Sequence, residues 1–167
     1  IILGELSLNG SLVPVKGVLP IAINAHNEGF KHMIVPLENA NEAAVVEGLQ
    51  VFGFQHIREV IDFFNQKQDF SPTIFNPLQS EPENTTFYDF KDVKGQETVK
   101  RALEIAASGA HNLLMIGPPG SGKTMLARRL PGILPPMTVE ESLETTKIHS
   151  VAGKLPRNCS LITTRPF

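Results

Sequence analysis

The sequence is poor in the features of secreted, disulfide-stabilised or membrane-spanning proteins. Its 167 residues include one cysteine, Cys159, a single tyrosine and no tryptophan. One cysteine cannot form an internal disulfide, which excludes a disulfide scaffold and favours a reducing compartment. No apolar run approaches the roughly 20 residues that a membrane-spanning helix needs, and no signal peptide opens the chain. We therefore expect a cytoplasmic protein that does not enter membranes.

Charge is sparse and unevenly divided. Charged residues make up 19% of the chain, and the formal net charge is −2. Residues 1–90 carry a net charge of −7, whereas residues 91–167 carry +5. A basic half can face nucleotide or nucleic acid, but these basic residues are scattered, so a chance division between two domains explains the asymmetry equally well. The five histidines show no metal-ligand spacing, and we assign none of them to a metal.

Residues 117–124 read Gly-Pro-Pro-Gly-Ser-Gly-Lys-Thr, a complete phosphate-binding loop of the form G-x-x-x-x-G-K-[ST]. The apolar residues 113–116 before it predict a buried strand, and residues 125–130 after it predict a helix that stops at Pro131. At such a junction, successive backbone N–H groups and the helix N-terminus converge on one anion. The alternative is a Gly/Pro-rich turn, but both flanks and all fixed positions favour the phosphate loop.

The motif predicts that the chain binds a nucleoside triphosphate together with Mg²⁺. We assign Lys123 a catalytic role, since its amine can reach the β- and γ-phosphates, and we expect the Thr124 hydroxyl to bind the metal ion. The glycines let the backbone approach the phosphates without a Cβ atom in the way. The predicted nucleotide-binding residues are Gly117, Pro118, Pro119, Gly120, Ser121, Gly122, Lys123, Thr124 and Met125.

A polar segment, residues 66–86, divides the chain. It is rich in Gln, Asn, Ser, Pro and Thr, cannot bury much apolar surface, and is typical of an extended linker. Strands and helices alternate on both sides of it, which predicts two α/β domains with separate cores, residues 1–65 and residues 87–167. We expect the second to hold only the first strands of its sheet, leaving an unpaired edge that can pair with another copy.

The first region is predicted to contain a β-hairpin followed by alternating helices and strands. Residues 5–8 and 12–15 flank Asn9-Gly10, which predicts a type I′ turn. Helices are expected at 21–28, from an N-cap at Asn41 to Glu47, and at 56–64, with strands at 31–35 and 49–54.

Two sets of sequence segments in this region resemble the C-terminal part of the Lon protease domain. They are residues 4–10 with 13–15, and residues 29–36 with Glu38-Asn39. The resemblance implies a Lon-like α/β fold, but Leu19 stands where the Lon catalytic lysine belongs and Lys16 lies three residues too early. The serine of that dyad would lie upstream of Ile1. Because leucine cannot accept a proton, we expect no peptidase chemistry.

The second region opens with Val93-x-Gly95-Gln96, which resembles the lead-in of AAA+ ATPases, where this backbone flanks the adenine. A helix with its apolar face between Val99 and Ala107 follows and ends at Gly109. Beyond the phosphate loop, residues 138–141 form a capping-box signature for a helix to about residue 148. Residues 161–164 predict another strand.

Residues 112–124, 128–136, 148–153 and 161–167 together resemble the magnesium-chelatase-like AAA+ proteins of bacteria, and within them the ComM/YifB family. That family joins a Lon-like domain to an AAA+ module. The resemblance implies a Lon-like domain fragment followed by a truncated P-loop AAA+ domain. It also implies that the full-length protein is an ATPase that uses ATP and Mg²⁺, assembles into a hexameric ring and acts on DNA, with branch migration of recombination intermediates as the family activity.

Two other functional classes remain open. One is a magnesium-chelatase motor subunit, although the Lon-like first region argues against it. The other is a non-enzymatic adaptor in which nucleotide binding orders a partner surface. After Thr124 the sequence contains no apolar strand ending in Asp-Glu, and no sensor residue or arginine finger is evident. We therefore expect these residues to cradle phosphates but to hydrolyse ATP poorly by themselves.

Overall fold

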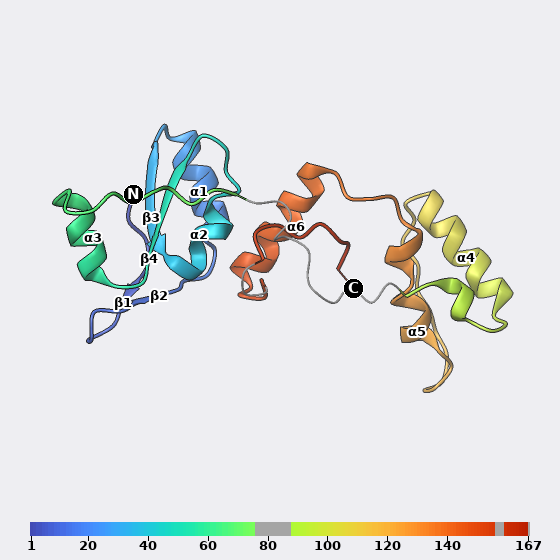
Figure 1. Ribbon diagram of the computed structural model, residues 1–167. Coiled ribbons are helices and arrows are strands. Elements are labelled where there is room, and N and C mark those ends of the chain that lie inside the picture. The colour runs from blue at the N-terminus through green and yellow to red at the C-terminus, as the bar shows by residue number, and fades with distance from the viewer. Residues whose placement is uncertain (76–87, 156–158, 167) are drawn as a thin grey trace. The chain divides into compact units, whose positions relative to one another are not determined.

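The computed structural model describes residues 1–75, 88–155 and 159–166 (Figure 1). The chain divides into two compact units. The first consists of Ile1–Pro82 with Val139–Thr163, and the second of Glu83–Thr138 with Thr164–Phe167.

The first unit begins with the predicted hairpin, in a shorter form. Strands β1 (Glu5–Leu6) and β2 (Leu12–Val13) pair antiparallel. The turn is not of type I′, because that type needs a positive φ at both central residues and Asn9 is not among the residues with positive φ. Instead the Gly10 N–H donates to the Ser7 carbonyl oxygen at 2.9 Å, and Gly10 has a φ of +89°. The Asn9 carboxamide oxygen accepts from the Ser11 N–H at 3.0 Å and stabilises this wider loop.

A small parallel sheet forms the centre of the first unit. Strands β3 (His32–Pro36) and β4 (Gln50–Phe54) pair in register from His32 with Gln50 to Pro36 with Phe54. Apolar side chains cover both faces of the sheet, as expected for parallel strands. Helices α1 (Val18–Asn27) and α2 (Leu37–Ala43) lie on one side and α3 (Ile57–Phe64) on the other (Figure 1). The first face packs around Met33, Val35 and Val51, and the second around Ile34, Phe52 and Phe54.

Most predicted elements of residues 1–65 are present, but α2 starts elsewhere. Helix α2 begins directly after Pro36, four residues before the predicted N-cap at Asn41. Asn41 lies within the helix, while Ala40 and Ala43 pack into the core beside the sheet. Tertiary packing of these alanines therefore decides the helix position over the local capping preference of Asn41.

Helix α6 (Val139–Val151) packs on the first unit, beside α1. The sequence placed residues 139–163 with the phosphate loop, whereas their contacts join them to residues 1–82. The predicted linker also departs from a free extended chain at its start, because Phe70 packs against Phe54 and the Thr73 N–H donates to the Val51 carbonyl oxygen. Residues 76–86 of that linker lie outside the described residues. The boundaries 1–65, 66–86 and 87–167 stay a prediction.

The second unit is helical in its described part. It contains a 3₁₀ turn, η2 (Phe90–Asp92), helix α4 (Glu97–Ser108), helix α5 (Lys123–Ala127) and a second 3₁₀ turn, η3 (Leu130–Ile133). The predicted helix before the loop is therefore confirmed as α4, with Gly109 at its C-cap. The helix after the loop is shorter than predicted and passes into η3 before Pro131.

The two strands predicted in residues 87–167 are not formed. Residues 113–116 and 161–164 are extended or irregular, with Leu114 82% and Ile116 89% exposed. A strand needs a hydrogen-bonded neighbour, and neither segment is paired with a strand among the described residues. The coarse prediction of a mixed α/β chain is confirmed, with its sheet confined to the first unit. Within the described residues, no helix has the length and apolar character to cross a membrane.

Candidate nucleotide-binding site

The predicted phosphate loop, residues 117–124, runs from an extended segment into the first turn of α5. Gly120 and Gly122 have φ values of +81° and +84°, a conformation that other residues adopt only at a cost. Gly122 is the N-cap of α5, and its carbonyl oxygen accepts from the Leu126 N–H at 2.9 Å. A Cβ atom at Gly120 would meet nothing within 4 Å, so backbone conformation and not crowding requires glycine there.

The Lys123 side chain lies within the curve of the loop. Its Nζ donates to the carbonyl oxygens of Gly117 at 2.8 Å and Pro118 at 2.7 Å, and contacts the Ser121 Oγ at 3.2 Å. The amine therefore joins the beginning of the loop to its end. The ammonium group is held by carbonyl oxygens of the loop, and it is itself a charged donor of the kind that binds phosphate.

The remaining predicted site residues are accessible. Gly117 to Gly120 and Thr124 are exposed, Ser121 to Lys123 are half-buried, and Met125 is 39% exposed. Gly117 to Gly122 lie in the loop, and Lys123 to Met125 form the first turn of α5. The Mg²⁺ role of Thr124 stays a prediction. The described residues contain no group of three or more His, Cys, Asp or Glu side chains that could hold a metal ion alone.

A small apolar core supports the loop from behind. Val93, Leu103 and Leu126 are buried together, and Val99, Met115 and Leu130 pack around them. Val93 begins the predicted adenine-flanking segment, and Gly95 and Gln96 both have positive φ, at +68° and +62°. The turn before α4 and the helix after the phosphate loop therefore share one core, which fixes the segment 93–96 relative to the loop.

Arg129 makes further contacts beside the loop, which the sequence did not predict. Its Nε donates to the Asp89 carbonyl oxygen at 2.9 Å, its Nη1 donates to the Met125 carbonyl oxygen at 2.8 Å, and its guanidinium lies 5.4 Å from the centre of the Tyr88 ring. Arginine just past a helix end is suited to bind the free carbonyls there. The Asp89 side chain in turn accepts from the Lys91 N–H, and hydrogen bonds to Lys91 lower the pKa of this carboxyl.

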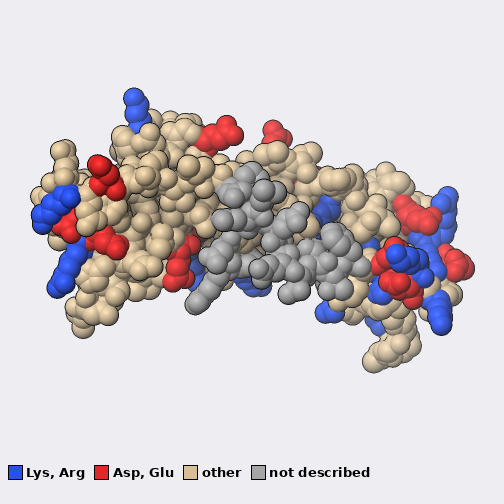
Figure 2. All heavy atoms as spheres, viewed as in Figure 1, with Lys and Arg blue, Asp and Glu red and all other residues tan. Residues whose placement is uncertain are grey.

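Charges of both signs alternate on the visible face of α4, and no single-sign basic patch is evident there (Figure 2). Lys100 pairs with Glu97 at 3.1 Å and Arg101 with Glu104 at 2.9 Å along this helix. Exposed pairs of this kind contribute little to stability. These pairs lie within residues 91–167 and leave the net charge of +5 of that half unchanged.

Two protein-family models match the chain. One, described as magnesium chelatase, subunit ChlI, covers residues 89–167, and the other, described as subunit ChlI of Mg-chelatase, covers residues 1–39. An uncharacterized protein of Mycobacterium tuberculosis is 44% identical over 167 residues, which are 100% of this chain and 33% of that protein. The competence protein ComM of Haemophilus influenzae is 42% identical over 88% of this chain and 29% of its own length. The protein YifB of Escherichia coli is 40% identical over 91% of this chain and 29% of its own length.

The chain belongs to the magnesium-chelatase-like family, of the ComM/YifB type. It spans about a third of the length of the curated relatives that it matches. The mitochondrial Lon protease homolog of Homo sapiens is 36% identical over 64 residues, which are 35% of this chain and 7% of that protein. This match shows partial homology of the chain to Lon proteases.

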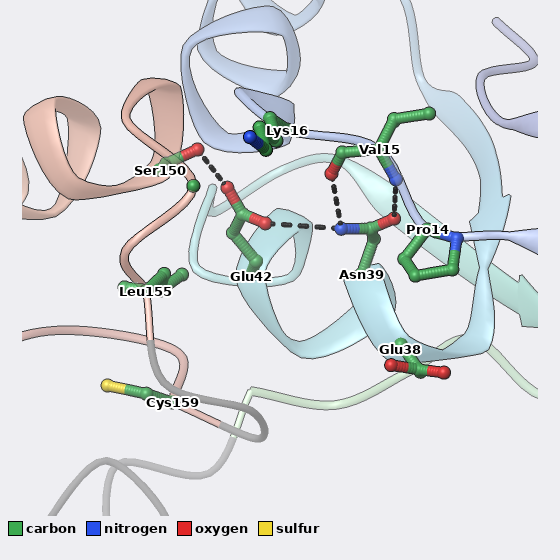
Figure 3. Close-up of a pocket in the computed structure, with 10 residues that line it drawn as sticks. Pro14, Val15, Lys16, Glu38, Asn39, Glu42, Ser150, Leu155 and Cys159 are labelled. Atoms are coloured by element: carbon green, nitrogen blue, oxygen red, sulfur yellow. Dashed lines mark hydrogen bonds between the residues drawn. The ribbon is translucent and has the colours of Figure 1, made fainter.

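A cavity of about 590 Å³ in the first unit is lined both by the Lon-like region and by residues between 150 and 159, and it lies near the position where Lon has its catalytic lysine (Figure 3). Leu19 itself is fully buried in α1, so it presents no functional group. Lys16 is exposed at the cavity wall and lies against Gly153, so a side chain at residue 153 would collide with it. The cavity is lined by Pro14, Val15, Lys16, Glu38, Asn39, Glu42, Ser150, Gly153, Leu155 and Cys159. Burial raises the pKa of the Cys159 thiol, which makes it a poor nucleophile near neutral pH.

Proposed function

We propose that residues 117–124 bind the phosphates of ATP, and that residues 87–167 are the first part of a P-loop AAA+ domain. The observation that supports this most directly is the position of the Lys123 amine within a glycine-rich loop that opens a helix. The loop offers backbone N–H groups, a charged amine and a hydroxyl in consecutive residues. Bound ATP would supply the energy of hydrolysis, with Mg²⁺ held in part by Thr124.

Backbone contacts and Lys123 would orient the triphosphate. Hydrogen bonds to charged groups contribute roughly 1.5–3 kcal/mol each, so the lysine alone accounts for a large part of nucleotide affinity. The turn at Val93, Gly95 and Gln96 shares a core with α5 and would flank the adenine, as the AAA+ resemblance implies. Such a division lets one small unit bind both ends of the nucleotide.

For the whole protein we propose an ATPase that assembles into a hexameric ring in the cytoplasm and moves on DNA. The argument rests on the family and on the name of the Haemophilus influenzae relative, a competence protein. Competence involves uptake and recombination of DNA, and a ring motor that drives branch migration would serve it. The Lon-like region is proposed to be a non-proteolytic structural domain.

A magnesium-chelatase motor subunit is a second candidate, because both family models that match the chain carry that description. Such a motor would drive insertion of Mg²⁺ into a tetrapyrrole. The partial match to a Lon protease homolog favours the DNA motor, because the resemblance to the ComM/YifB family implies a Lon-like domain, which chelatase motor subunits are expected to lack. A nucleotide-gated adaptor is the third possibility.

ATP turnover by the full-length protein distinguishes these functions. We expect forked DNA to stimulate turnover severalfold and porphyrin with chelatase partner subunits to leave it unchanged. Stimulation by porphyrin and partners would instead indicate the chelatase motor, and nucleotide binding without turnover under either condition would indicate the adaptor. The Lys123→Ala variant is the control for contaminating ATPases in each assay.

A further inference from the structure

Within the first unit, helix α6 turns almost completely buried polar side chains inward. Its inward residues are Ser142, Thr146 and Ser150, which are 4%, 0% and 3% exposed. A helix that turned this polar stripe inward without partners would be unstable, because buried hydroxyls need hydrogen bonds. The Thr146 Oγ1 donates to the Ser142 carbonyl oxygen at 2.6 Å and accepts from the Ile162 N–H at 2.9 Å. The second of these hydrogen bonds joins residue 162 to α6.

Ser150 joins α6 to α2 through a hydrogen bond from its hydroxyl to the Glu42 carboxylate (Figure 3). Glu42 is 7% exposed, and its Oε1 accepts from both the Ser150 hydroxyl and the Leu19 N–H, the latter at 2.9 Å. Asn39 lies 3.4 Å from the other carboxylate oxygen. The Gly17 N–H also donates to the Ser150 carbonyl oxygen at 3.2 Å. We call this set of contacts the Glu42 latch.

The Glu42 latch holds α6. Along the chain, this helix lies between two segments that belong to the second unit, the unit with the phosphate loop. Only eleven residues, 128–138, separate the end of α5 from the start of α6, and they include Pro135-Pro136, which stiffens the connection. The chain returns to the second unit at Thr164. There the Arg165 Nε donates to the Pro135 carbonyl oxygen at 3.1 Å. This hydrogen bond joins the segment that leads to α6 to the segment that returns to the second unit. The connection between α5 and α6 is therefore short, and its proline segment is hydrogen-bonded to residue 165.

We propose that α6 (Val139–Val151) is a coupling element, and that nucleotide binding to residues 117–124 changes the stability of the Glu42 latch. This inference rests on the proposed nucleotide binding. A buried carboxylate with several donors is suited to such a role, since the contact is either made or replaced by hydration. Linkage then requires reciprocity: if nucleotide alters the latch equilibrium, breaking the latch alters nucleotide affinity by the same factor.

The test uses the full-length protein and two measurements. The first is the dissociation constant of a fluorescent ATP analogue for wild type, Ser150→Ala, Glu42→Gln and the double variant. The second is hydrogen exchange of the α6 amides with and without ATP. Ser150→Ala removes only one hydroxyl and leaves the Leu19 contact intact, so it should fold. Glu38→Gln is the matched control, because it makes the same chemical change on α2 at an exposed position in the same cavity.

We expect Ser150→Ala and Glu42→Gln to shift the dissociation constant by at least about threefold in the same direction, with no further shift in the double variant, because both act through one contact. Glu38→Gln should bind like wild type. The direction of the affinity change must agree with the hydrogen exchange. If ATP slows exchange of the α6 amides in wild type, the variants should bind the ATP analogue more weakly. If ATP speeds that exchange, they should bind it more tightly.

Wild-type binding with unchanged affinity in Ser150→Ala and unchanged α6 exchange would overturn the coupling and leave the proposed nucleotide site intact. Shifts of opposite sign to those that reciprocity requires would also overturn it. No binding by wild type would instead overturn the proposed function, and the coupling with it.

Discussion

The Lys123 Nζ donates a hydrogen bond of 2.8 Å to the carbonyl oxygen of Gly117, six residues earlier and at the opposite end of the phosphate loop. A single side chain therefore sets the curvature of the loop as well as its charge. Replacing Lys123 removes a cation and also three polar contacts that join the two ends. This double role makes Lys123 the residue on which the proposed function depends most.

Thr124→Val should separate metal-dependent from metal-independent binding. Valine keeps the shape of threonine but lacks the hydroxyl that we assign to Mg²⁺. We expect affinity for Mg²⁺-ATP to fall by about tenfold, roughly 1.4 kcal/mol, while affinity for ADP in EDTA stays within about twofold. Isothermal titration of both ligands into the full-length protein checks this. An equal loss for both would show that Thr124 acts on the loop and not on the metal ion.

The Lon-like region should have no peptidase activity. Leu19 is fully buried, and Lys16 stands against Gly153 at the cavity wall. We expect the full-length protein to leave casein and fluorogenic peptides intact with or without ATP, and Lys16→Ala to change nothing. Cleavage by wild type that disappears in Lys16→Ala would show that Lys16 and not Leu19 occupies the catalytic register.

Leu126→Ala should destabilise the second unit without touching the nucleotide. Leu126 is 3% exposed and packs against Val93 and Leu103. Truncating a buried leucine costs about 2–5 kcal/mol, so the denaturant midpoint of this unit should fall clearly. Ile105→Ala on α4 is the control, since Ile105 is 51% exposed and its truncation should be nearly neutral. Equal effects of both changes would contradict the core described here.

Asp89→Asn should weaken the turn before α4 in a pH-dependent way. Hydrogen bonds from Lys91 lower the pKa of the Asp89 carboxyl below its ordinary value of 3.8. The stabilisation is therefore complete above that ordinary value and is lost as the pH falls through the lowered one. Thermal unfolding should show a deficit for Asp89→Asn at pH 7 that disappears towards pH 2. A deficit that persists unchanged at low pH would contradict the charged role of Asp89.

Local sequence signals predicted the elements that local interactions control. Gly109 ends α4, and His56 at the N-cap of α3 accepts from the Arg58 N–H, so both helices fall close to their predicted bounds. Predictions based on local capping at Asn41 and on the Asn9-Gly10 turn were wrong where packing or a wider loop decided the backbone conformation.

The sequence predicted the residues of the candidate site, but it did not predict the contacts that hold the loop in place. The glycines and Lys123 form a contiguous motif, and contiguity alone places them in one loop. Arg129 and Asp89 are 40 residues apart, so no spacing rule joins them. The exposed residues 113–116 show the converse: their apolar pattern predicts a strand, but pairing requires a neighbour that the described residues do not provide.

Titration of wild type and Lys123→Ala with a fluorescent ATP analogue tests the central claim most directly. Loss of one charge-assisted contact of roughly 1.5–3 kcal/mol corresponds to a loss of about ten- to hundredfold in affinity. We predict that decrease in the full-length protein, together with loss of ATP turnover, while far-ultraviolet circular dichroism stays unchanged. Equal affinity and equal turnover in both proteins would show that residues 117–124 are only a turn and would contradict the proposed function.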